Sequence, residues 1–168
     1  ISSSAHLVIP SLVLDWPDQG LAFDVAVHVG TLGAVIFYYR RDLLEIAQGW
    51  FVSLGGGGAT DESRMVWYLL AASVPAGLLG VLQGGYIEAH ARSLPVIATT
   101  TLLFGLLLGF ADRYAQHKPG SHRLTFGVAV LIGLAQAVAL IPGVSRSGAT
   151  ITAALLLNMS RQDAARFS

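Results

Sequence analysis

The stretch that decides the fold is LIPGVSRSGAT, residues 140–150. It places Arg146 among small and hydroxyl residues, with one apolar run before it at 126–141 and another after it at 149–157. Neither run reaches the ~20 residues that a helix needs to cross a bilayer. A solvated loop between two helices is one interpretation. The alternative is an ionisable residue held at membrane depth, which by default marks a functional site.

The residues around Arg146 favour an anion. An arginine carries a fixed positive charge and a planar fork of donors that matches phosphate oxygens two at a time. Ser145, Ser147 and Gly148 resemble the start of a helix, where unpaired backbone N–H groups and the helix dipole attract negative charge. Together these features predict a phosphate-binding site.

Composition indicates an integral membrane protein. Hydrophobic residues make up 54% of the chain, charged residues only 12%, and the mean hydropathy is +0.62. A soluble domain has about a quarter charged residues. The net charge is zero and the basic residues are scattered, which argues against a nucleic-acid binder. The chain starts without methionine and stops within a helix-like pattern, so we expect a piece of a longer protein.

The apolar runs predict an all-α polytopic membrane domain, incomplete, over residues 1–168. Residues 1–14 are too short for a span and predict the second arm of a first re-entrant hairpin. Three transmembrane helices and a second re-entrant hairpin follow, at 23–39, 65–82, 94–111 and 125–158. Three crossings place the two hairpins on opposite sides, so their tips can meet near the midplane. This arrangement is typical of inverted repeats with broken helices.

Several smaller features complete this prediction. Residues 42–54 predict an amphipathic helix at the interface, and residues 84–93 a short polar connection. Three neighbouring threonines, residues 99–101, are expected to bond within or between helices. Asp24 and His28 are four residues apart and therefore on one helix face. Arginine and lysine concentrate in 40–64 and 112–123, which places these two connections on the cytoplasmic side.

The sequence resembles a known family. PGVSRSGAT (142–150) and ISSSAH (1–6) resemble the two signature segments of the bacterial undecaprenyl-diphosphate phosphatases, the bacitracin-resistance family. Residues 23–31, 73–80 and 160–168 resemble further segments of the family in the same order and spacing. The resemblance covers nearly the whole chain.

The resemblance implies a hydrolase of the bacterial inner membrane with its site facing outward. It would remove the terminal phosphate from undecaprenyl diphosphate, recycle the lipid carrier for cell-wall synthesis and give bacitracin resistance. The family uses a divalent cation, Mg²⁺ or Ca²⁺. Its catalytic serine, histidine and arginine match Ser3, His6 and Arg146. Its diphosphate-binding residues match Ser145, Arg146, Ser147, Gly148 and Thr150. The family's metal-binding glutamate segment is expected upstream of Ile1, so no metal ligand is assigned within this chain.

Several alternatives stay open at this point. Ser3 could attack with His6 as base, His6 could attack itself, or a metal-bound water could attack with His6 as acid. Ser2, Ser3 and Ser4 could instead be helix caps. The possible cavity-lining residues are Ser2, Ser4, Gln136 and His28. A transporter or flippase of a polyprenyl phosphate lipid is the competing function, because broken helices at the midplane also bind transported substrates. The predicted partners are the lipid substrate and the bilayer, with a homodimer as an option.

Overall fold

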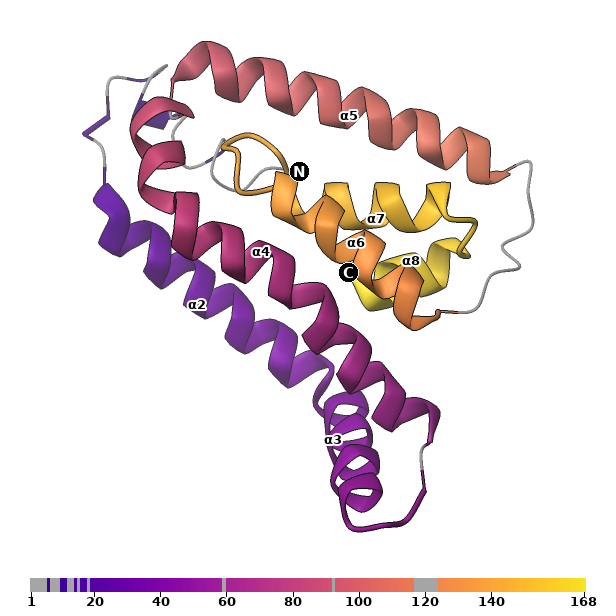
Figure 1. Ribbon diagram of the computed structural model, residues 1–168. Helices are drawn as coiled ribbons and strands as arrows, with labels where there is room; N and C mark the ends of the chain where they lie inside the picture. Colours follow the sequence, from indigo (N-terminus) through magenta and orange to yellow (C-terminus); the bar gives the residue numbers. More distant parts are fainter. Residues whose placement is uncertain are drawn as a thin grey trace. The chain divides into compact units, whose positions relative to one another are not determined.

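The computed structural model describes residues 6, 10–11, 14, 16–17, 19–58, 60–91, 93–116 and 124–168 (Figure 1). These residues form helices α2 to α8 and their connections, and the described part contains no strand. The all-α prediction is confirmed. The described residues divide into two units, His6–Trp67 and Tyr68–Ser168, each of which is considered by itself. Most of the predicted first hairpin, including Ser2, Ser3 and Ser4, lies outside the described residues.

The first unit contains α2 (Gly20–Tyr38), α3 (Arg40–Leu54) and the start of α4 (Asp61–Ala91). A helix at 42–54 is confirmed by α3, which has no fully buried residue, and its place at the membrane interface stays a prediction. A reciprocal cap begins α4, because the Thr60 hydroxyl accepts from the Ser63 N–H at 3.2 Å and the Ser63 hydroxyl accepts from the Thr60 N–H at 3.0 Å. Glu62 in the first turn suits the positive end of the helix dipole.

Helix α4 is longer than its sequence pattern predicts. It passes through Pro75 and continues to Ala91, so the predicted polar connection at 84–93 is wrong for most of its length. The glycine pair Gly84 and Gly85 does not end the helix. Near its end, the His90 Nδ1 lies 3.0 Å from the carbonyl oxygen of Tyr86. Polar residues in the sequence show where a helix leaves an apolar layer. They do not show where the backbone stops being helical.

In the second unit, α7 (Arg146–Leu156) lies at the centre. It packs against α5 (Leu94–Gln116), α6 (Phe126–Val138) and α8 (Arg161–Phe167), as Figure 1 shows. The core of this unit consists mainly of small side chains. On α6, Ala129, Gly133 and Ala137 are spaced four residues apart and are all buried. Small residues at this spacing let helix backbones approach closely.

Gly133 shows how close that approach is. A Cβ atom added there would collide with the backbone carbonyl oxygen of Ala72 on α4 and lie 2.6 Å from the Ala72 Cα. The aromatic rings of Tyr68 and Phe126 also meet across the same helix pair, with centroids 6.4 Å apart. Helices α6 and α4 therefore approach closely at the point where Gly133 meets Ala72.

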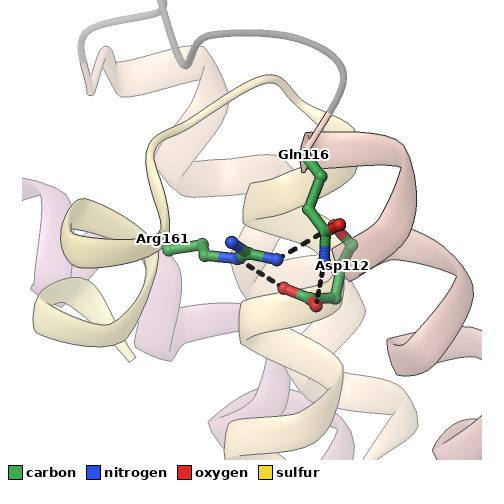
Figure 2. Close-up of polar contacts among 3 residues, drawn as sticks. All are labelled: Asp112, Gln116 and Arg161. Carbon is green, nitrogen blue, oxygen red and sulfur yellow. Dashed lines mark hydrogen bonds and ion pairs between the residues drawn. The ribbon is translucent and has the colours of Figure 1, made fainter.

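Helix α8 is held at its first residue by an ion pair. The Arg161 Nε donates to the Asp112 Oδ1 at 2.6 Å, and Gln116 donates to the other carboxylate oxygen at 3.3 Å (Figure 2). The hydrogen bond that Arg161 donates to the Asp112 carboxylate raises the pKa of the Arg161 guanidinium, which stays charged. Both side chains are substantially exposed, so solvent and salt screen the pair. Its main effect is to fix where α8 begins relative to the end of α5.

Within the described residues, two helices are long and apolar enough to cross a membrane, Asp61–Ile87 within α4 and Leu94–Gln116, which is α5. In the most apolar window of each, only 6% of the residues are buried. These helices therefore expose apolar side chains instead of burying them, unlike the core helices of a soluble protein. The shorter apolar helices Val25–Tyr38 and Phe126–Val138 do not reach this length.

Candidate functional site

The predicted anion site begins where α6 ends. Residues 139–145 form a loop that reverses the chain, and α7 starts at Arg146. Successive turn hydrogen bonds close the end of α6, and the N–H of Val144 donates to the Ile141 carbonyl at 3.2 Å. Gly143 has φ +92°, a left-handed conformation that favours glycine. The sequence PGVSRSG thus forms a tight loop that delivers the chain into a helix N-terminus.

Ser145 caps that N-terminus. Its backbone is extended (φ −71°, ψ 126°), and its hydroxyl accepts from the Gly148 N–H at 3.1 Å. The Ser145 and Ser147 hydroxyls lie 3.2 Å apart. An N-cap satisfies one of the N–H groups of the first helical turn and leaves others directed out of the helix end. The predicted helix start at Ser145 is confirmed.

Arg146 is the first residue of α7 and is exposed. No described carboxylate pairs with its guanidinium; the Arg161–Asp112 pair involves a different arginine. Ser147 is exposed beside it, whereas Gly148 is buried. An arginine and two serines therefore stand together at the positive end of a helix dipole, and this combination of residues is suited to a phosphate group.

Thr150 occupies a different position from these residues. Its side chain is 3% exposed, and its hydroxyl lies 2.6 Å from the Ser168 hydroxyl. The same oxygen lies 3.0 Å from the Arg146 carbonyl and 3.2 Å from the Ser147 carbonyl. These contacts tie the first turn of α7 to the end of α8. Contact between Thr150 and a diphosphate remains a prediction.

The other predicted site residues are not brought to Arg146 by what is described. Gln136 is half-buried on α6, six residues before Pro142. His28 is half-buried on α2 and His6 is exposed, both in the other unit. The side chain of Asp24, the predicted neighbour of His28, lies outside the described residues, as do Ser2, Ser3 and Ser4.

Two hydroxyl contacts to the loop were missed by the sequence reasoning. On α5, the Thr100 hydroxyl donates to the Pro142 carbonyl at 2.7 Å, and the Thr101 hydroxyl donates to the Gly143 carbonyl at 3.1 Å. The signal was present in the three consecutive threonines at 99–101, for which bonds within or between helices were expected. The three threonines did not indicate which carbonyl groups they would bond, because the loop lies 42 residues away in the sequence.

Among the described residues, no group of three or more His, Asp or Glu side chains is placed to hold a metal ion. Divalent cations such as Mg²⁺ and Ca²⁺ take oxygen ligands, chiefly carboxylates. The described donor set therefore does not fit a cation site, and we derive no reaction step through a metal.

The fold and the site together define a class, a helical membrane protein with an arginine and serine hydroxyls at a helix N-terminus. The comparisons with known proteins agree with this class. The family described as bacitracin resistance protein BacA matches residues 1–168. The chain belongs to that family.

Curated relatives support the assignment. The chain is 58% identical over 168 residues to an undecaprenyl-diphosphatase of Teredinibacter turnerae, with 100% of this chain and 64% of the relative covered. It is 57% identical to an undecaprenyl-diphosphatase of Saccharophagus degradans and 54% identical to undecaprenyl-diphosphatase 1 of Pseudoalteromonas translucida, covering all of this chain and 63% of each. The chain thus spans just under two thirds of the length of these relatives.

Proposed function

We propose that the protein hydrolyses undecaprenyl diphosphate to undecaprenyl phosphate and orthophosphate. Water supplies the oxygen that bonds to the terminal phosphorus, and the bridging P–O bond breaks. The observation that carries the proposal is the placement of Arg146, exposed and without a described acidic partner, at a serine-capped helix N-terminus. The names of the curated relatives supply the substrate.

The residues of α7 have a defined part in this reaction. Phosphoryl transfer needs negative charge neutralised on the phosphoryl oxygens. The Arg146 guanidinium would hold two of these oxygens through its fork, and the N–H groups of the first turn of α7 would face the same charge. The Ser145 and Ser147 hydroxyls, 3.2 Å apart, would donate to neighbouring diphosphate oxygens. These donors stabilise charge best where water is excluded.

The remaining machinery is proposed from the family resemblance. Ser3 and His6 would take part in nucleophilic attack and proton transfer, with Ser3, His6 or a metal-bound water as the attacking group, and Gln136 would line the cavity. A divalent cation, Mg²⁺ or Ca²⁺, would add positive charge at the diphosphate, held by residues other than those described here. We place the protein in the bacterial inner membrane as a multi-pass protein with two re-entrant hairpins and the site facing outward. Recycling of the lipid carrier would give bacitracin resistance.

The test is orthophosphate release from undecaprenyl diphosphate by the full-length protein in detergent, with and without a chelator. Arg146→Ala and His6→Ala are assayed beside it, and Thr99→Val on exposed α5 surface serves as the matched control. We expect cation-dependent release that both site substitutions abolish and the control retains. Folded protein that binds the lipid but releases no phosphate would contradict the proposal.

A further inference from the structure

We infer that Thr100 and Thr101 of α5 are positioning residues for the site, because their hydroxyls hold the loop that presents Arg146. The inference rests on the proposed function and deepens it. Neither threonine is among the residues that the sequence motif marks. Both come from a helix that supplies no other group to the predicted anion site.

The contact is a double one. Two adjacent hydroxyls on α5 donate to two adjacent carbonyls in the loop, at 2.7 Å to Pro142 and 3.1 Å to Gly143. The Thr100 hydroxyl also lies 2.8 Å from the Val96 carbonyl and 3.1 Å from the Ile97 carbonyl within its own helix. A hydroxyl has one proton, so these acceptors compete for it. The Pro142 oxygen is the nearest of the three.

Gly143 makes this contact possible. A side chain at this position would collide with the Thr100 hydroxyl and would place its Cβ 2.6 Å from the Ile97 carbonyl oxygen. The positive φ of Gly143 turns the loop backbone toward α5. Gly143, the two threonine hydroxyls and the surface of α5 therefore form one close contact. The loop is attached to α5 two residues before the Ser145 cap.

The contact also has an electrostatic consequence. Backbone carbonyl oxygens carry partial negative charge, which would repel a diphosphate near the N-terminus of α7. The two threonine protons offset this charge on the Pro142 and Gly143 oxygens and direct both oxygens toward α5. The repulsion that these two oxygens would exert on a diphosphate at the N-terminus of α7 is thereby reduced.

The experiment replaces the hydroxyls and keeps the shape. Thr100→Val and Thr101→Val are made singly and together in the full-length protein, with Thr99→Val as matched control and the Thr→Ser changes to restore each hydroxyl. We expect the double valine variant to lose turnover by about tenfold to a hundredfold, since misplacing a catalytic group by about 1 Å has effects of that size. Serine at both positions should recover most of the loss.

The discriminating measurement is a double-mutant cycle with Arg146→Lys. If the threonines act through the Arg146 loop, the double valine change should lower turnover by less than about twofold when it is added to the Arg146→Lys variant, because coupled positions are not additive. Equal losses with and without the Arg146→Lys change would overturn the inference and leave only a structural role for the threonines. A loss as large in Thr99→Val would overturn it too.

The inference and the proposed function fail separately. If the unsubstituted protein releases no orthophosphate, the proposed function fails. The same variants are then compared by their affinity for undecaprenyl diphosphate. Weakening by about tenfold in the double valine variant, with recovery in the serine variant, would support the positioning role, and unchanged affinity would refute it.

Discussion

Gly143→Ala should destabilise the protein and disable its site. Alanine in a left-handed conformation costs about 1–2 kcal/mol. The new Cβ would lie 2.6 Å from the Ile97 carbonyl oxygen, whereas ordinary contact begins at 3.4 Å, so the loop must move by roughly 0.8 Å. The same movement would stretch the 3.1 Å bond between Thr101 and Gly143 beyond hydrogen-bonding distance.

The expected sum is a loss of about 1.5–3.5 kcal/mol, when about 0.5–1.5 kcal/mol is added for the hydrogen bond lost between Thr101 and Gly143. For a chain of this size the melting temperature in detergent should fall by about 10 °C. Gly105→Ala on α5 is the matched control, since a Cβ there meets nothing within 4 Å and alanine favours the helix. A melting temperature within about 2 °C of the parent, with normal turnover, would refute the reasoning.

Other contacts give three further predictions. Gly133→Ala should lower the melting temperature by several degrees, because its Cβ would meet the Ala72 backbone and force α6 away from α4; an unchanged melting curve would contradict the close packing. Arg146→Lys keeps the charge but loses the fork, so turnover should fall at least about tenfold, and near-normal orthophosphate release would exclude bidentate binding. Trp50 on α3 should sit at headgroup depth, so in a variant whose other tryptophans, Trp16 and Trp67 included, are replaced by phenylalanine, lipids brominated near the headgroup should quench its fluorescence more than lipids brominated deep in the acyl chains; the reverse order would rule out an interfacial α3.

The helices were predictable because their signals are local. Apolar runs locate α5 and α6, and the hydroxyl cap at Ser145 locates the start of α7. Helix ends were less predictable, since polar residues can extend a helix beyond the apolar layer, as α4 does as far as Ala91. The link between Thr101 and Gly143 could not be predicted at all. A hydroxyl on an apolar helix needs some acceptor, but its identity depends on how two distant segments pack.

Thr150 is a motif residue whose hydroxyl already has partners within the protein. Its hydroxyl is buried and surrounded by the Arg146 and Ser147 carbonyls and the Ser168 hydroxyl. With one proton to donate, it can bond one acceptor at a time and accept from Ser168 in addition. Thr150 thus stabilises the first turn of α7, which contains Arg146. Thr101 holds the loop that precedes the Ser145 cap. Hydroxyls from separate helices fix the backbone of the first turn, and the turn can then present its charge without rearranging when the diphosphate arrives.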